Sequence, residues 1–166
     1  MDPLTGALNR RGLAEFATQL FKDGDRPGPS MLCLDLDDFK LVNDRLGHAA
    51  GDKLLQRTVA TAREMLRAED AIARVGGDEF VVVLVDTDEA TTRTMVARID
   101  AAVRQHAAVS IGSATAPHDG DTLETLMQVA DQRLYRVKQD RRRAANSPLA
   151  DGHGLVSSRS DTLGAP

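Results

Sequence analysis

The chain alternates between stretches with helical spacing of apolar residues and short, nearly continuous apolar runs. Apolar residues that recur every three or four positions predict four amphipathic helices. These segments span residues 13–20, 55–66, 95–103 and 123–134. Four short runs, rich in β-branched residues, separate the helical segments and predict strands. They span Met31 to Asp37, Ile72 to Val75, Phe80 to Val85 and Val109 to Ala116.

This order of elements indicates one sheet with helices packed against its faces. The second and third runs are joined by a short turn, so at least one pair of strands is expected to be antiparallel. The last helix is predicted to begin at Asp121, because Glu124 follows three residues later as in a capping box. After about Ala144 the pattern stops. Residues 144–166 are rich in Ser, Gly, Asp and Pro, so we expect a domain over residues 1–143 and a disordered tail after it.

Composition narrows the range of functions. The chain has 166 residues, of which 42% are hydrophobic, and this suits one globular domain with a sizeable core. Its formal net charge of −4 argues against sequence-independent binding to nucleic acid, so we expect no nucleic-acid partner. No run of about 18 apolar residues is present, and the single cysteine, Cys33, lies within a short apolar run. We therefore expect a cytoplasmic module with an inert thiol, taken from a larger multidomain or membrane-bound protein whose regulatory domain is missing.

Two adjacent glycines and two adjacent acids stand between the second and third predicted strands. Gly76 and Gly77 are expected to supply the positive φ that a tight hairpin requires. Asp78 and Glu79 repel each other unless a cation or a proton lies between them. The alternative is an ordinary turn whose acids are solvated, and the turn alone leaves both interpretations open.

A second group of acids follows the first predicted strand. Asp35 and Asp37 point to the same face of that strand, and Asp38 stands where the chain enters a short helix. One of Asp37 and Asp38 is expected to cap that helix, which leaves the other acids unexplained. If this strand lies beside the hairpin, Asp35 approaches Asp78 and Glu79, and three carboxylates around one point suit a hard cation such as Mg²⁺.

Three separated motifs carry a resemblance to a known family. They are DPLTGALNRRG at residues 2–12, DLDDFKLVNDRLGHAAGD at residues 35–52 and GGDEF at residues 76–80. In this order and spacing, from Asp2 to about Arg143, the chain resembles the GGDEF family of diguanylate cyclases. The resemblance implies a palm-like α+β fold with a central, largely antiparallel sheet flanked by helices. It also implies an enzyme that condenses two GTP molecules into cyclic di-GMP and two pyrophosphates at the interface of a head-to-head homodimer.

By resemblance, the metal ligands are the side chains of Asp35, Asp78 and Glu79 and the backbone carbonyl of Leu36. The cofactor is expected to be Mg²⁺, with Mn²⁺ as the alternative. Two ions about 4 Å apart would activate the attacking 3′-hydroxyl and neutralise charge on the α-phosphate and the leaving pyrophosphate. Asp78 and Glu79 are thus the expected catalytic residues, and Asp78 acts either as a base or only as a ligand.

The resemblance also assigns residues to GTP. Backbone N–H groups around Asp38 and Phe39 would hold the β- and γ-phosphates at a helix N-terminus, and Asn43 and Asp52 would meet the guanine edge. An aspartate there accepts from the N1–H and the amine of guanine, which favours GTP over ATP. The full expected substrate-binding set is Asp38, Phe39, Lys40, Asn43, Asp52, Gly76, Gly77, Lys138 and Arg142.

Near its end the chain departs from the family pattern KxxGRN. Lys138 and Arg142 match the pattern, but Arg141 stands in place of glycine and Arg143 in place of asparagine. For Arg141 and Arg143 we favour a solvated, basic helix end. The departures leave the end of the helix and the placement of Arg142 open.

A further motif bears on regulation. The segment RAED, residues 67–70, matches the product-inhibition motif of the family, and Arg67 and Asp70 would bind cyclic di-GMP. The companion arginine of the family falls near Asp100, an acid, so inhibition is weakened or passes through Arg98.

The alternative to an enzyme is a non-catalytic module that binds GTP or cyclic di-GMP and relays a signal to a partner. The intact GGDEF turn argues against that alternative.

Overall fold

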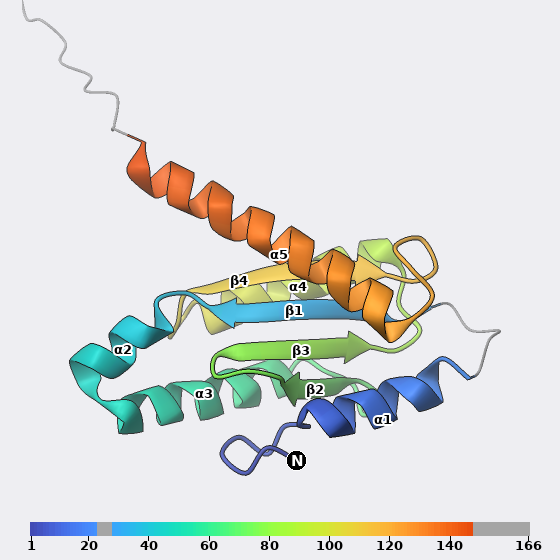
Figure 1. The fold of residues 1–166 in the computed structure, drawn as a ribbon, viewed down its shortest axis with the longest axis horizontal. Coiled ribbons are helices and arrows are strands. Elements are labelled where there is room, and N and C mark those ends of the chain that lie inside the picture. The colour runs from blue at the N-terminus through green and yellow to red at the C-terminus, as the bar shows by residue number, and fades with distance from the viewer. Residues whose placement is uncertain (23–27, 148–166) are drawn as a thin grey trace, which may run out of the picture.

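The middle of the structure is strand β1, Ser30–Leu36, which is paired along both edges. The computed structural model describes residues 1–22 and 28–147. The strand order of its sheet is β2-β3-β1-β4, and all neighbouring strands are antiparallel (Figure 1). The other strands are β2 (Ala71–Arg74), β3 (Glu79–Leu84) and β4 (Val109–Thr115). The predicted α+β fold with a central antiparallel sheet is confirmed.

Helices cover both faces of the sheet, as Figure 1 shows. On one face lie α1 (Arg10–Leu20) and α5 (Leu123–Asn146). On the other face lie α3 (His48–Arg63) and α4 (Glu89–Val103). The short helix α2 (Phe39–Leu46) leads from β1 to α3. No helix among the described residues is both long and apolar enough to cross a membrane.

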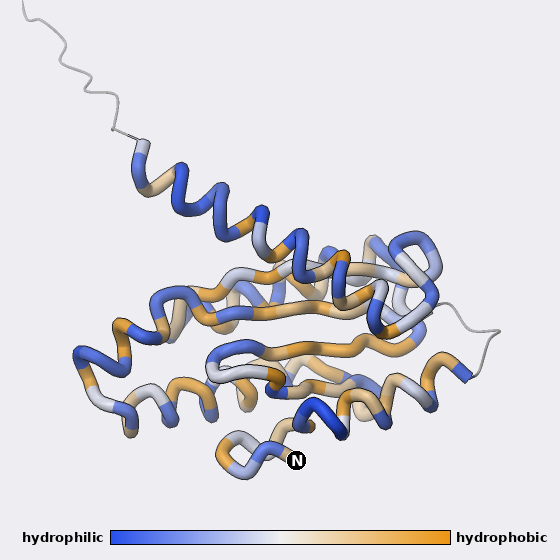
Figure 2. The backbone as a smooth tube through the Cα atoms, in the orientation of Figure 1, coloured by the Kyte–Doolittle hydropathy of each residue, from blue (hydrophilic) through white to orange (hydrophobic). Residues whose placement is uncertain are grey.

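The two faces of the sheet carry separate apolar cores, because side chains alternate along each strand. In β1, Leu32, Leu34 and Leu36 belong to the core beneath α3 and α4, whereas Met31 and Cys33 belong to the core beneath α1 and α5. All five are nearly inaccessible to solvent. Apolar positions accordingly follow one another along most of β1 and along β3 (Figure 2). A strand that is buried on both faces has a continuous apolar sequence rather than an alternating one.

Several helices and strands begin or end at residues other than the predicted ones. Each strand differs from its predicted span by at most one residue at either end. Helix α3 ends at Arg63, so Leu66 lies beyond it. Helix α5 continues to Asn146, past the point where its apolar pattern stops. Residues 148–166, which form most of the predicted disordered tail, lie outside the described residues.

The start of α5 has a capping box, but not the predicted one. Thr122 is the N-cap residue, and its hydroxyl accepts from the N–H of Thr125. The hydroxyl of Thr125 in turn accepts from the N–H of Thr122. Asp121 and Glu124 do not make this pair, so the predicted N-cap is wrong by one residue and the helix begins at Leu123 rather than at Asp121. Threonine and aspartate are both good caps, and the backbone conformation decides between neighbouring candidates.

The GGDEF turn joins β2 to β3, but its glycines do not behave as predicted. Neither Gly76 nor Gly77 has a positive φ, which the described part of the chain shows at three other glycines. At Gly76 a side chain would overlap the carboxylate of Glu79, which folds back over the turn. In this structure the first glycine therefore leaves room for the Glu79 carboxylate rather than supplying an unusual φ.

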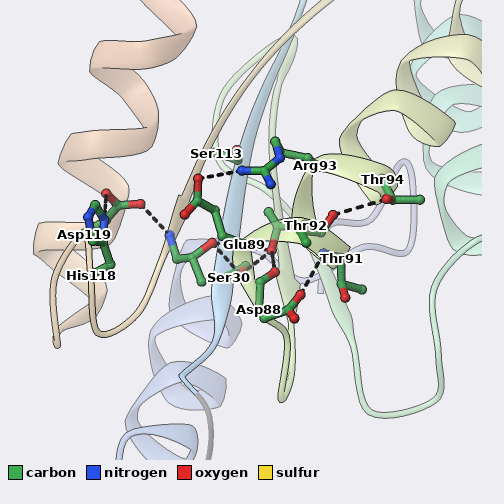
Figure 3. Close-up of polar contacts among 12 residues, drawn as sticks. Ser30, Asp88, Glu89, Thr91, Thr92, Arg93, Thr94, Ser113, His118 and Asp119 are labelled. Carbon is green, nitrogen blue, oxygen red and sulfur yellow. Dashed lines mark hydrogen bonds and ion pairs between the residues drawn. The ribbon is translucent and has the colours of Figure 1, made fainter.

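At the end of the sheet far from this turn, buried hydroxyl groups join α4 to the strands (Figure 3). Thr92 of α4 donates to Oγ of Ser30 at 2.6 Å, and Ser30 donates to the hydroxyl of Thr115 at 2.9 Å. All three residues are buried. Asp88 caps α4 by accepting from the N–H of Thr91 at 2.7 Å. These bonds fix the start of α4, so the helix runs toward the opposite end of the sheet.

The loop between β4 and α5 is held by one charged pair. Arg133 of α5 donates to both oxygens of Asp119 at 2.7 Å and to the carbonyl of Ser113. Asp119 also accepts from the N–H of Thr115, and its side chain is only 8% exposed. Hydrogen bonds from Arg133 in particular hold the pKa of the Asp119 carboxyl well below its usual range.

Replacing Asp119 by asparagine is expected to destabilise the protein by about 2 kcal/mol at neutral pH, because charged hydrogen bonds are lost. The pKa of Asp119 is lower in the folded protein than in the unfolded chain. The stabilisation is therefore complete above the unfolded-state pKa and is lost as the pH falls through the folded-state pKa. Urea denaturation at several pH values would measure both effects, and the stabilities of the wild-type protein and the variant should converge in acid.

Asp121→Asn is the matched control, because Asp121 is an exposed acid on the same loop. Its free energy of unfolding should stay close to the wild-type value. An Asp119→Asn variant as stable as the wild-type protein at neutral pH would contradict the role assigned to the pair.

Candidate functional site

The predicted site residues gather at the end of β1 that leads into α2. A cleft of about 510 Å³ opens there between the start of α2, the GGDEF turn and the last turns of α5. Figure 1 shows α5 crossing the sheet and extending past its edge at this end. The lining residues are Asp35, Leu36, Asp37, Asp38, Phe39, Lys40, Asp78, Arg104, Ala108, Lys138, Arg141, Arg142 and Ala145. Acids from the strand and the turn therefore share one opening with cations from the helix.

Asp35 and Asp78 form the acidic side of the cleft. Asp35 is paired with Glu79 in the register of β1 and β3. The carbonyl of Asp78 accepts from the N–H of Leu36 at 3.2 Å, which holds the turn against the end of β1. Partial burial raises the pKa of Asp78, and the charge of Asp35 raises it further. The two carboxylates thus repel each other, a condition under which a bound cation is stabilising.

Lys138 supplies the positive charge closest to these acids. Its Nζ lies 2.6 Å from Oδ1 of Asp35, and both side chains are largely buried. The charge of Lys138 also lowers the pKa of Asp78, although burial and Asp35 outweigh it. The structure therefore places the ammonium group of Lys138 directly beside Asp35, which the sequence predicts to be a metal ligand.

The acids of the predicted metal site are divided between two cavities. Asp35 and Asp78 line the cleft, whereas Glu79 folds back against Gly76 and lines a separate cavity of about 260 Å³ beside Cys33. In residues 1–22 and 28–147, no three carboxylate, histidine or cysteine side chains converge closely enough to hold a metal ion. Burial raises the pKa of the Cys33 thiol, which suits its predicted inertness.

The start of α2 provides backbone donors at the cleft. Asp38 has a φ of 57°, in the left-handed region that is uncommon for residues other than glycine. Its side chain makes no capping hydrogen bond. Within the described residues, no hydrogen bond engages the N–H groups of Asp38, Phe39 and Lys40. The first N–H groups of a helix attract anions, so this segment suits a phosphate.

Asp37 does not cap α2 either: Asp38 occupies the predicted N-cap position, but neither carboxylate makes a capping hydrogen bond. The Asp37 carboxylate accepts from the hydroxyl of Ser110 at 2.8 and 3.1 Å and pairs with Arg141 at 3.0 Å. Its N–H donates to the carbonyl of Ala108 at 2.8 Å. A guanidinium and a hydroxyl thus hold the carboxylate on the side of β4 and α5, because a charged partner outcompetes a helix N–H.

Positive charge dominates the remaining walls of the cleft. Five cations, against four carboxylates, are contributed by Lys40, Arg104, Lys138, Arg141 and Arg142. Lys138 and Arg142 stand one helical turn apart on the same face of α5, as their predicted role requires. Arg143 is exposed, as predicted. Arg141 is not the solvated residue that the sequence predicted, because two carboxylates bind its guanidinium.

The predicted guanine contacts lie beside the cleft, on α2 and α3. Oδ1 of Asn43 is buried and has no hydrogen-bond partner among the described residues. It lies over Gly51, where any side chain would overlap it. Asp52, the next residue of α3, is exposed. A buried amide oxygen without a partner costs free energy, so Asn43 suits a group that a ligand would satisfy.

The predicted inhibition motif forms the turn between α3 and β2. Asp70 accepts from the N–H of Arg67 and from the N–H of Val85, both at 2.9 Å. Its carboxylate therefore supports the backbone, whereas Arg67 is exposed. Both residues line a pocket of about 450 Å³ that does not include Arg98. Arg98 contacts the sulfur of Met95 at 3.7 Å instead.

Two arginines that the sequence did not single out hold the GGDEF turn in place. Arg74 donates to the carbonyl of Gly77 at 2.8 and 3.1 Å, and its Nη1 lies 3.3 Å from Oδ2 of Asp2. Arg10 donates to the carbonyl of Val75 at 2.5 Å. The only sequence signal for these contacts is the presence of Asp2 and Arg10 in the first motif and of Arg74 just before the turn.

Comparison with known proteins agrees with this geometry. The family model for "Diguanylate cyclase, GGDEF domain" matches residues 1–144. Diguanylate cyclase DgcP of Pseudomonas aeruginosa is 37% identical over 149 residues, and the match covers 83% of this chain and 22% of DgcP. The chain spans only 19% to 33% of the first curated relatives that it matches.

Solved structures agree as well. A truncated form of PA1120 from Pseudomonas aeruginosa, which comprises only its GGDEF domain, has a TM-score of 0.79 at 33% identity, covering 84% of this chain and 88% of that one. A microbial GGDEF domain studied with cyclic di-GMP has a TM-score of 0.74 at 36% identity, covering 84% and 93%. On its motifs, its fold and these matches, the chain belongs to the GGDEF domain family.

Proposed function

We propose that the chain condenses two molecules of GTP into cyclic di-GMP and releases two pyrophosphates. The observation that carries this proposal is the cleft at the end of β1, where Asp35 and Asp78 share one opening with the cations of α5 and the start of α2. Acids that repel each other suit a divalent cation. Cations beside unbonded helix N–H groups suit a triphosphate. The activity in the name of DgcP supports the same reaction.

The reaction requires two copies of the chain. The 3′-hydroxyl of one GTP attacks the α-phosphorus of the other, its proton passes to Asp78 or to solvent, the bond from that phosphorus to the bridging oxygen breaks, and pyrophosphate leaves. A second attack with the roles exchanged closes the ring. One cleft that holds one GTP supplies either the nucleophile or the leaving group, so two clefts face each other in a head-to-head homodimer. GTP is a cytoplasmic nucleotide, which places the domain in the cytoplasm.

The residues at the cleft fit a resident divalent cation, Mg²⁺ or alternatively Mn²⁺. Asp35, Asp78 and the carbonyl of Leu36 would hold it, and Glu79, which lines the neighbouring cavity in this structure, would complete the ligand set only after turning toward the cleft. The fit is supported by the repulsion between Asp35 and Asp78 and by Lys138, whose charge lies 2.6 Å from Asp35. When bound, the cation polarises the α-phosphate and neutralises charge on the leaving pyrophosphate.

Residues from two helices would hold the phosphates. The N–H groups of Asp38 and Phe39 at the start of α2 would bind the β- and γ-phosphates, with Lys40 beside them. Lys138 and Arg142 of α5 would bind the same groups from the opposite wall. This arrangement orients the α-phosphate toward Asp35 and Asp78 without any covalent step by the protein.

Residues of α2 and α3 would select guanine. Asp52 would accept from the N1–H and the amine of the base, and the partnerless Oδ1 of Asn43 would accept from the amine. Adenine lacks this pair of donors, so ATP would leave both acceptors unsatisfied. Gly76 and Gly77 would allow the nucleotide to approach the backbone of the turn closely.

A module that binds GTP or cyclic di-GMP without turnover is the second candidate. The position of Glu79, apart from Asp35 and Asp78, favours it. Incubation of concentrated protein with GTP and Mg²⁺, followed by chromatography, separates the two candidates. Cyclic di-GMP as product supports the enzyme, and bound but unchanged GTP supports the module. High protein concentration is needed because the reaction depends on the dimer.

Glu79→Gln tests the catalytic assignment. The variant is expected to lose at least about 100-fold in turnover, because a negative ligand is removed from the point where charge develops. Its fold should be retained, since the side chain is exposed. Glu124→Gln, at an exposed position on α5, is the control and should keep full turnover. Undiminished product from Glu79→Gln would refute the role of Glu79.

Asp78→Asn tests the electrostatics of the proposed metal site. The pKa of Asp78 is raised in the folded protein, so its ionised form opposes folding, and this penalty grows as the pH rises through the unfolded-state pKa toward the folded-state pKa. The variant is therefore expected to melt at the same or a higher temperature than the wild-type protein without Mg²⁺.

Adding Mg²⁺ should raise the melting temperature of the wild-type protein and have little effect on Asp78→Asn. Differential scanning calorimetry with and without Mg²⁺ measures both quantities. An equal rise in the two proteins would remove Asp78 from the ligand set.

Cyclic di-GMP is proposed as a product inhibitor that binds at Arg67, with Asp70 and Arg98 completing the predicted set. The exposed guanidinium of Arg67 and the pocket beside it support this site. Arg67→Ala is expected to weaken binding of cyclic di-GMP at least about tenfold, a loss of about 1.4 kcal/mol. Asp70 is unsuitable for the test, because it also supports the backbone.

Calorimetric titration with cyclic di-GMP provides the measurement. Arg57→Ala, which removes an exposed arginine of α3, should bind like the wild-type protein. Retained affinity in Arg67→Ala would exclude this site while leaving the catalytic proposal intact.

A further inference from the structure

A charge network ties the end of α5 to three other parts of the fold. Arg141 pairs with Asp37 at 3.0 Å and with Asp100 at 3.3 Å. The same guanidinium donates to the hydroxyl of Ser110 at 2.9 Å and to the carbonyl of Val109. Asp37 follows β1, Asp100 belongs to α4, and the other two residues belong to β4. One side chain thus joins four elements at the rim of the cleft.

Arg141 is also the last anchor of α5. Within residues 1–22 and 28–147, the hydrogen bonds and ion pairs from α5 to other elements end at Arg141. Residues 142–147 are exposed, and Figure 1 shows this part of the helix extending past the sheet. The direction of the last turns is therefore set by Arg141 together with the pair of Lys138 and Asp35.

The two phosphate-binding candidates of α5 flank this anchor. Lys138 lies three residues before Arg141, Arg142 follows it directly, and both line the cleft. On the other wall, Asp37, which Arg141 binds, immediately precedes the N–H group of Asp38. Arg141 therefore holds both walls of the cleft at once.

Arg141 is poorly suited to bind a phosphate itself. Two carboxylates already bind its guanidinium, and leaving Asp37 without this charged partner would cost more than one new contact returns. We propose instead that Arg141 is a positioning residue, which fixes the spacing between the start of α2 and the Lys138–Arg142 face of α5 so that both hold one triphosphate. This inference rests on the proposed function, because it takes the cleft to be the triphosphate site.

Arg141→Gln is expected to weaken binding of the nucleotide and to leave the rate of the chemical step nearly unchanged. The probe is 3′-deoxy-GTP with Mg²⁺, which lacks the attacking hydroxyl and so reports affinity alone. Its Kd, from calorimetry, should rise about tenfold, and the KM for GTP should rise equally while kcat stays within about twofold. Arg141→Lys keeps the charge without the planar fork and should restore only part of the affinity.

Two comparisons separate positioning from a general loss of structure. Arg143→Gln removes an exposed arginine of the same helix and should leave the Kd unchanged. In a Lys138→Gln background, the loss caused by Arg141→Gln should shrink to about threefold or less, because one of the groups that Arg141 positions is gone. A tenfold loss in both backgrounds would indicate general loosening and overturn the proposal.

The positioning role and the catalytic function fail in different ways. If the wild-type protein binds 3′-deoxy-GTP and Arg141→Gln binds it equally well, only the positioning role is overturned. If the wild-type protein binds the probe but makes no cyclic di-GMP, the catalytic function is overturned, and the ratio of the two Kd values still decides the role of Arg141. If the wild-type protein binds no triphosphate, both proposals are overturned.

Discussion

Burial of β1 on both faces is the constraint on which the candidate site depends. Its apolar side chains belong to two different cores, so a slip of one residue would move each side chain into the other core, where the packing partners differ. The register with β3 and β4 is therefore fixed, and so is the point where the strand turns polar. Asp35 stands opposite Glu79, and Asp37 emerges next to β4. Apolar packing, not attraction among the acids, places the carboxylates at the cleft.

The electrostatics of the cleft oppose this packing. Asp35 and Asp78 are brought together although each raises the free energy of the other's ionised form. Lys138 offsets part of that repulsion, and Arg141 neutralises Asp37. The remaining excess of positive charge lies along α5 and at the start of α2, on the walls that face the acids. The acids lie at the centre of the site and the cations at its rim. This arrangement complements a metal–triphosphate complex, in which the metal ion would meet the acids and the phosphates would meet the cations.

The sequence located the strands of this fold well because its short apolar runs are nearly continuous. A strand buried on both faces is easy to find by such a run, but the run does not reveal which side chain meets which helix. The behaviour of Gly76 could not be predicted for a related reason. A glycine is required either for a positive φ or for close packing, and the motif is the same in both cases. Only the structure distinguishes them: neither glycine of the turn has a positive φ, and the Glu79 carboxylate lies close over Gly76.

The site residues that sequence reasoning missed or misjudged share a different property, because their partners are far away in the chain. Arg141 and Asp37 are 104 positions apart, and Arg74 and Asp2 are 72 apart. Compared with the family pattern position by position, Arg141 and Asp100 are two independent departures. In the structure they are partners at 3.3 Å. Either one alone would leave a partly buried charge with fewer partners beside a charged cleft. The two departures therefore meet in one contact, which ties the end of α5 to α4.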